Sequence, residues 1–278
     1  MDVDPRPSAL RRVGILMLTR TLQVTRALLR ASLATAMQYR ADFLLDATTG
    51  LFRTLATAAP LWVVYGLTDA VSGWTLAEAT LVMGLFFLMQ ALVGGLIEPN
   101  LGMVVEAVRT GTLDLVLLKP ADAQLLVSVR TVAPARLWDG IAALMMIGWS
   151  LSQRGSLEPA DAVMALTLLL CGLLAIYSVW LIAICASFFF VRVDNLRFLL
   201  WSASDAGRWP IDVFSGWVRF VLTAMIPVAL VTSYPAMALA GQWQAGLVLQ
   251  SMTIAGVLLL GSRRLWTWSL THYTSASS

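Results

Sequence analysis

The longest charge-free segment of the chain, residues 162–191, runs for 30 residues without an Asp, Glu, Lys or Arg. A helix needs about 20 mostly apolar residues to cross the hydrocarbon layer of a membrane, so this segment is long enough for one crossing and an additional turn or two. Of the 278 residues 59% are apolar and only 13% are charged, whereas soluble proteins have about 25% charged residues. The sequence therefore predicts an all-α integral membrane protein.

Four further segments have the length and apolar character of transmembrane helices. They are residues 43–66, 77–98, 134–153 and 244–262. The first and the third contain ionisable residues inside their apolar sequence, whereas those of the second, Glu78 and Glu98, lie at its ends. Together with the charge-free segment they make five expected crossings.

Residues 195–238 are harder to divide, because charged residues and prolines interrupt their apolar sequence. Lys and Arg concentrate in cytoplasmic loops, and two crossings here would place Arg263 and Arg264 outside the cell. One crossing, at 195–217, keeps them inside. We therefore expect six transmembrane helices with cytoplasmic N- and C-termini, and short re-entrant helices at the outer surface over residues 218–238.

A basic, amphipathic pattern precedes the first crossing, over residues 10–40. On a helix, Leu10, Met17 and Leu28 fall on one stripe, while arginines such as Arg26 cluster on another side. This pattern predicts an amphipathic helix lying at the membrane surface. The alternative is a soluble helix that packs on another subunit.

The longest segment expected outside the membrane is the cytoplasmic stretch 99–130. It is too short to form a nucleotide-binding domain, and the GxxxxGK[ST] phosphate-binding motif does not occur in the sequence. The chain itself is therefore not expected to be an enzyme or to hold a cofactor. Any energy from ATP has to come from a partner protein.

Four stretches of the chain resemble the permease subunits of bacterial type-2 ATP-binding-cassette (ABC) exporters, in particular the six-helix branch grouped with antibiotic and drug exporters. They are YRADFLLDATTGLFR, VRTGTLDLVLLKP, IPVALVTSYPAMALAG and HYTSASS. The resemblance extends from about residue 30 to the end. Its most specific part includes Arg109, Gly111, Leu113, Asp114 and Lys119, although members of the family more often have Arg where this chain has Lys119.

The resemblance implies a cytoplasmic coupling helix between transmembrane helices 2 and 3, which binds a separate ATP-binding subunit. It further implies two copies of that subunit, with ATP and Mg on the partner, and a second permease that forms a homodimer or a heterodimer with this one. The complex would lie in the bacterial cytoplasmic (inner) membrane. Its cargo would be a hydrophobic or amphipathic small molecule, as in multidrug or antibiotic efflux, or a lipid-like compound.

The proposed coupling segment is the cytoplasmic stretch 99–130. Its residues are consistent with a short helix that ends at a glycine. Glu106 and Arg109 are spaced i,i+3 and share a helix face, and Gly111 can end a helix in the left-handed conformation. Asp114 is placed to cap a following helix. The alternative to docking on a partner is a local turn that folds back on this subunit.

Charges inside the expected first crossing form a second candidate site. Asp42, Asp46 and Arg53 recur at helical spacing, and an ionic side chain at mid-membrane costs about 2.5–3.5 kcal/mol, so this stripe should face protein or water. One interpretation is a structural ion pair of Arg53 with Asp139 or Asp212. The other is a lining of the subunit interface and the substrate route.

A third group, Asp205, Arg208 and Asp212, surrounds Pro210 in the expected fifth crossing. These side chains either pair near the outer leaflet or form a polar patch at a broken helix that opens a gate.

Other classes of protein are less well matched. A secondary transporter needs ion-coupling residues on broken helices in two related halves, and no repeat is apparent. An intramembrane enzyme needs a nucleophile and a base, yet the single histidine, His272, lies near the C-terminus, and we expect neither a catalytic residue nor a metal site. The spread of the arginines argues against nucleic acid as a partner, while membrane lipid is an expected one. A non-transporting membrane anchor of a complex stays an alternative.

Overall fold

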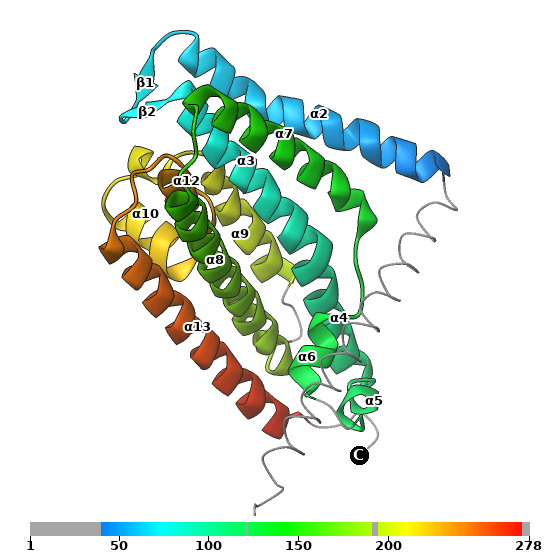
Figure 1. The fold of residues 1–278 in the computed structure, drawn as a ribbon. Helices are drawn as coiled ribbons and strands as arrows, with labels where there is room; N and C mark the ends of the chain where they lie inside the picture. Colours follow the sequence, from blue (N-terminus) through cyan, green and yellow to red (C-terminus); the bar gives the residue numbers. More distant parts are fainter. Residues whose placement is uncertain (1–39, 120–121, 191–193, 274–278) are drawn as a thin grey trace, which may run out of the picture.

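The computed structural model describes residues 40–119, 122–190 and 194–273, and they form a bundle of long helices with one small β-hairpin (Figure 1). The longer helices are α2 (Arg40–Tyr65), α3 (Leu76–Leu92), α4 (Glu98–Thr110), α7 (Leu137–Arg154), α8 (Pro159–Cys185), α9 (Asp194–Ser204) and α13 (Ala245–Thr271). The shorter elements are β1 (Ala70–Val71), β2 (Trp74–Thr75), α5 (Asp114–Leu117), α6 (Ala123–Ser128), α10 (Gly216–Phe220), α11 (Val228–Val231) and α12 (Ser233–Leu239). The expected amphipathic helix at 10–40 lies, up to residue 39, outside the described residues.

Three of the described helical segments are long and apolar enough to cross a membrane. They are Leu76–Thr110, Pro159–Phe188 and Ala245–Thr271. A fourth candidate is the pair Gly216–Met225 and Val228–Leu239, which bends by 66°. The helices α2, α3, α7, α8 and α13 begin within three residues of the segments expected from sequence.

The helix that begins with α3 is longer than the sequence analysis predicts. The cap at its start is a reciprocal one, in which Thr75 Oγ1 accepts from the Glu78 N–H and the Glu78 carboxylate accepts from the Thr75 N–H at 2.9 Å. From there α3 continues through a π-helical turn at Val93–Ile97 into α4. The helix therefore continues past residue 98, where the second crossing is expected to end, into the first part of the expected cytoplasmic segment. The end of the crossing itself stays a prediction.

Pro99 is accommodated inside this continuous helix by a bond from elsewhere in the chain. Proline has no N–H, so the carbonyl four residues earlier, that of Gly95, loses its normal helical donor. The Ala133 N–H donates to this oxygen at 2.9 Å instead. A proline that would otherwise break the helix thus attaches it to the segment leading into α7.

The prediction of one continuous helix over residues 195–217 is wrong. Helix α9 ends at Ser204, and two 3₁₀ turns, Asp205–Arg208 and Ile211–Val213, precede α10. The break follows from Pro210, which disfavours helical conformation at the preceding residue; Trp209 is accordingly extended.

The segment 218–238 is broken as expected. Its two helical parts meet at Pro227, and the second part, α11 with α12, is almost entirely buried against α8. Its position at the outer membrane surface stays a prediction.

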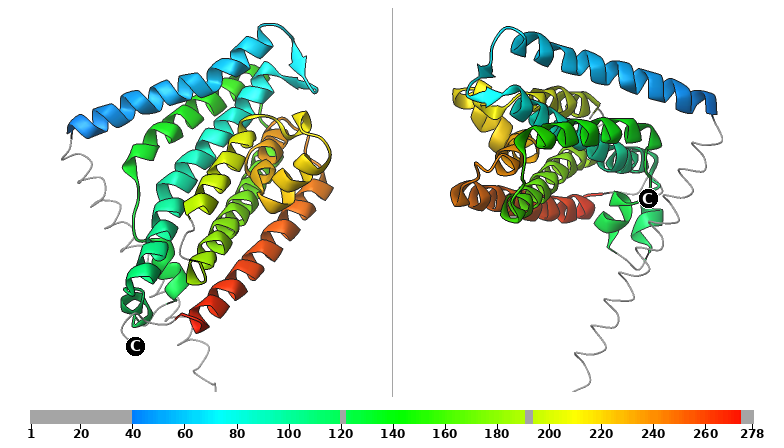
Figure 2. Two further views of the ribbon diagram at one scale, coloured as in Figure 1. Left: turned by 180° about the vertical axis from the view of Figure 1, so that it is seen from behind. Right: turned by 45° about the horizontal axis from the view of Figure 1, so that its top comes forward.

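The two ends of the bundle differ in character (Figures 1 and 2). The β-hairpin and α12 lie at one end, and α5, α6 and the C-terminal end of α13 lie together at the other. In between, α3 packs on α7, and α8 packs on α13, α11 and α12. The segments expected in the cytoplasm therefore lie at one end of the molecule.

Candidate functional site

The end of α4 has the geometry expected of it. Glu106 and Arg109 form an exposed ion pair at 2.8 Å across one helical turn. Gly111 ends the helix with a φ of 72°, in the left-handed region that favours glycine. The Leu113 N–H then donates back to the Ala107 carbonyl at 3.2 Å, which closes the turn.

Beyond this turn, the leucines of the segment differ in burial. Leu113 is fully buried, whereas Leu115 is 66% and Leu118 81% exposed. The expectation that Asp114 caps the following helix is wrong, because Leu113 occupies the N-cap position and Asp114 lies in the first turn of α5. Lys119 follows and is exposed.

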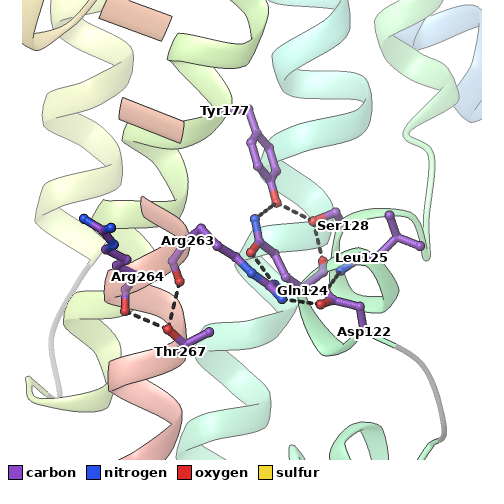
Figure 3. Close-up of polar contacts among 8 residues, drawn as sticks. All are labelled: Asp122, Gln124, Leu125, Ser128, Tyr177, Arg263, Arg264 and Thr267. Atoms are coloured by element: carbon purple, nitrogen blue, oxygen red, sulfur yellow. Dashed lines mark hydrogen bonds and ion pairs between the residues drawn. The ribbon is translucent and has the colours of Figure 1, made fainter. Parts of the chain in front are cut away.

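The N-cap of α6, Asp122, connects the coupling segment to the last long helix (Figure 3). Its carboxylate accepts from the Leu125 N–H at 3.0 Å and forms an ion pair with Arg263 of α13. Arg263 also donates to Gln124 Oε1 at 2.8 Å. The hydrogen bond from Arg263 is the main reason why the pKa of Asp122 is lowered.

A second set of bonds joins α6 to α8. The Gln124 amide donates to the Tyr177 hydroxyl at 3.1 Å, and Ser128 Oγ lies 2.8 Å from the same hydroxyl (Figure 3). The coupling segment is thus bonded to two long helices at once. Sequence reasoning missed this network, because Tyr177 looks like one more residue of an apolar helix, and Arg263 serves there only as an orientation signal.

The base of the coupling segment is closed by one buried amide. Asn100, only 1% exposed, donates to the carbonyls of Leu96 and Thr131 at 2.6 and 2.7 Å. Its own oxygen accepts from the N–H groups of Arg130 and Thr131 at 2.7 and 2.8 Å. The side chain is thus fully used, and it holds the segment that leads to α7 against the long helix.

A charged cavity of about 280 Å³ lies between α2, α3, α7 and α9. Its lining residues are Arg53, Thr57, Phe86, Phe87, Gln90, Arg136, Asp139, Trp201, Asp205 and Arg208. It therefore joins residues of the second and third groups that the sequence analysis singled out, Arg53 from the second and Asp205 and Arg208 from the third.

Asp139 is the central carboxylate of this cavity. It is 1% exposed and pairs with Arg53 at 2.5 Å and with Arg136 at 3.3 Å. The guanidinium of Arg136 also lies 5.6 Å from the ring centre of Trp201. Gly94 permits this placement, because a Cβ there would lie 2.7 Å from the Arg136 Nε.

The three predicted residues around Pro210 lie in two different places. Asp205 and Arg208 line the cavity, but Asp212 does not: it accepts from Trp74 Nε1 and pairs with Arg219, both at 3.0 Å. The three residues around Pro210 therefore do not share one site: two line the cavity, and Asp212 forms an ion pair outside it.

Of the remaining stripe residues, Asp46 is exposed on α2 and is not part of the cavity lining. Asp42 belongs to α2, and its side chain lies outside the described part of the chain.

Comparison with known proteins gives one finding. The family model described as ABC-2 family transporter protein matches residues 52–277. No curated protein and no solved structure is similar enough to this chain to count as a match. Since the matched region covers most of the chain and its helices have the length and apolarity of membrane spans, this integral membrane protein belongs to the ABC-2 family of transporter proteins.

Proposed function

We propose that the chain is the permease subunit of an ATP-driven ABC exporter in the bacterial cytoplasmic membrane. A separate subunit, present in two copies, binds ATP and Mg, and a second permease completes the pathway as a homodimer or a heterodimer. The cargo is a hydrophobic or amphipathic small molecule or a lipid-like compound. Family membership supports the transport role, and the resemblance to exporters supports the direction.

The observation that carries the proposal is the coupling segment itself. It presents exposed Leu115 and Leu118 next to the Glu106–Arg109 ion pair at one end of the bundle. Exposed leucines beside charged groups in a short segment outside the membrane are typical of a protein contact. Leu113 anchors the segment to the core of this subunit, so a force on it is passed inward.

The bonds of α6 give the direction in which that force travels. Closure of the ATP-binding subunits would displace the coupling segment. Its contacts through Arg263 and Tyr177 would then move α13 and α8. The ATP-bound and ATP-free partners bind different arrangements of the permease, and this difference drives the change of state without chemistry in this chain.

The experiment replaces Leu118 by glutamate and co-expresses the permease with an ATP-binding subunit that co-purifies with the wild-type permease. Burying a carboxylate at the contact is unfavourable, so we expect co-purification of the ATP-binding subunit to fall at least tenfold. Membrane insertion and thermal stability should stay at the wild-type level, because Leu118 is exposed.

Leu157→Glu is the matched control, since Leu157 is a partly exposed leucine in the connection between α7 and α8 at the opposite end. It should leave recovery of the partner unchanged. Wild-type recovery and wild-type ATPase activity with Leu118→Glu would mean that this segment does not couple to an ATPase, and would favour a non-transporting anchor.

A further inference from the structure

The charged cavity contains more cationic groups than its own carboxylates neutralise. Arg53, Arg136 and Arg208 supply three guanidinium groups, and Asp139 and Asp205 supply two carboxylates. Two of the three arginines share Asp139. The cavity therefore has a formal excess of one positive charge.

Arg208 has unused capacity to donate hydrogen bonds. Within the described ranges its Nε atom is buried without a hydrogen-bond partner. A buried N–H without an acceptor is unfavourable. The planar guanidinium fits the oxygens of a phosphate or carboxylate, which accept two parallel hydrogen bonds. An anionic group from outside the chain would satisfy this atom and offset the excess charge.

The depth of the cavity argues against ordinary surrounding lipid as its occupant. Phe86 and Gln90 of the lining lie 10 and 14 residues after Leu76, the first residue of α3. At a rise of about 1.5 Å per residue this is about 15–21 Å along the helix, so the lining extends from the middle of a hydrocarbon layer about 30 Å thick toward the side on which α7 begins. Head groups of surrounding lipids lie at the edges of that layer, so an anionic group at the level of Phe86 lies deeper than theirs.

Aromatic surface adjoins the guanidinium groups. Phe86 and Phe87 meet edge to face with ring centres 5.6 Å apart. Trp201 contacts Arg136 on one side and packs edge to face on Trp180 at 5.5 Å. The lining therefore combines an anion-binding group with apolar surface, which matches the two parts of an amphiphile.

We propose that this cavity binds the phosphate or carboxylate group of an anionic amphiphile. Arg208 and Arg53 contact the anionic oxygens, and Arg136 is a positioning residue held by Asp139 and Trp201. The inference rests on the proposed transport function and deepens it, because it assigns a class of cargo. A free inorganic anion offers the same oxygens, and the test separates the two sources.

The test measures thermal unfolding of the full-length permease in dodecyl maltoside, titrated with dodecyl phosphate. A ligand that binds only the folded state raises Tm with saturation. For Arg208→Gln we expect a half-saturating concentration at least tenfold above that of the wild type, and Arg208→Lys should recover part of the loss. The permease is tested without its ATP-binding partner, so a negative result here leaves the coupling proposal untouched.

Arg264→Gln is the matched control, because Arg264 is an exposed arginine near the end of α13, outside the cavity. It should respond as the wild type does. Dodecyl phosphocholine, with the same tail and no net charge, should produce no saturable rise. A response to inorganic phosphate at the same concentrations would show a site for free anions and overturn the amphiphile as the source.

Equal half-saturation for the wild type, Arg208→Gln and Arg53→Gln would overturn the proposal. The Arg53 variant keeps Asp139 paired with Arg136, so it preserves the test if Arg208→Gln does not fold. Two other results together would assign the cavity to the permease interface instead. They are a wild-type Tm that does not rise with dodecyl phosphate and a change of Arg208→Gln from dimer to monomer.

Discussion

Single glycines decide how closely the long helices of this protein approach one another. A Cβ at Gly172 of α8 would lie 2.5 Å from the carbonyl oxygen of Leu230 in α11, and one at Gly84 of α3 would lie 2.9 Å from Ile147 Cγ1 in α7. The neighbour of Gly172 is backbone, which cannot rotate out of the way as a side chain can. Gly172 is therefore less replaceable than Gly84, and it determines how closely α11 approaches α8.

Gly172→Ala should lower the free energy of unfolding by about 1–3 kcal/mol, because the added methyl group forces α8 and α11 apart. Gly148→Ala in α7 is the control, since a Cβ there meets nothing within 4 Å. Alanine also favours helix over glycine by about 1 kcal/mol, so this control should be neutral or stabilising. Thermal unfolding in detergent measures both, and equal Tm values for the two variants would contradict the packing argument.

At the scale of elements, α6 depends on side-chain contacts with other helices and not on the hydrogen bonds of its own backbone. It has six residues, too few to be stable alone, and it owes its position to the cap at Asp122, to Arg263 of α13 and to Tyr177 of α8. Asp122 and Arg263 are 141 residues apart in sequence. The link between the coupling segment and the bundle is thus a tertiary one.

Asp122→Asn should isolate the charge in this link, because asparagine keeps the capping oxygen. Arg263 lowers the folded-state pKa of Asp122 below its ordinary value of 3.8. The contribution of the pair to stability is therefore present above that value and is lost as the pH falls through the lowered pKa.

The Tm difference between the wild type and Asp122→Asn is the quantity to follow. We expect it to stay constant between about pH 5 and 7 and to shrink below about pH 4. A difference that persists unchanged at the lowest pH, or one that is absent at pH 7, would show that the ion pair does not hold α6.

At the scale of the whole molecule, the two ends of the bundle differ both in the elements that form them and in their basic residues. The coupling segment, α6 and the paired arginines at the end of α13 lie at one end, and the β-hairpin and the connection between α7 and α8 lie at the other. Basic residues concentrate on the cytoplasmic side of membrane proteins. We therefore infer that the end with α6 faces the cytoplasm.

Cysteines introduced at Ser156 and Thr271 test this orientation, because both positions are exposed and lie at opposite ends. In a background in which Cys171 and Cys185 are replaced by alanine, a membrane-impermeant maleimide added to intact cells should label Ser156→Cys. It should label Thr271→Cys only after the membrane is opened. Labelling of both positions in intact cells would contradict the inferred topology.

The sequence by itself determined the class of protein and the approximate position of most helices. Membrane transfer depends on the apolarity of each segment alone, so α2, α3, α7, α8 and α13 could be located by hydropathy. The end of α4 at Gly111 was also predictable, because the left-handed conformation of a glycine depends on the local sequence alone. Pro210 even offered a local signal for the early end of α9.

Only the tertiary structure decided which charged groups meet. From sequence, Arg53 had Asp139 and Asp212 as equal candidates, and nothing local distinguishes them. The choice depends on which helices are neighbours, and that is set by contacts such as those of Gly84 with α7 and Gly172 with α11. Those contacts bring Asp139 to Arg53, send Asp212 to Arg219 and leave Arg208 without a hydrogen-bond partner for its Nε among the described residues. Ionic partners depend on three-dimensional proximity, which a one-dimensional pattern of apolarity does not contain.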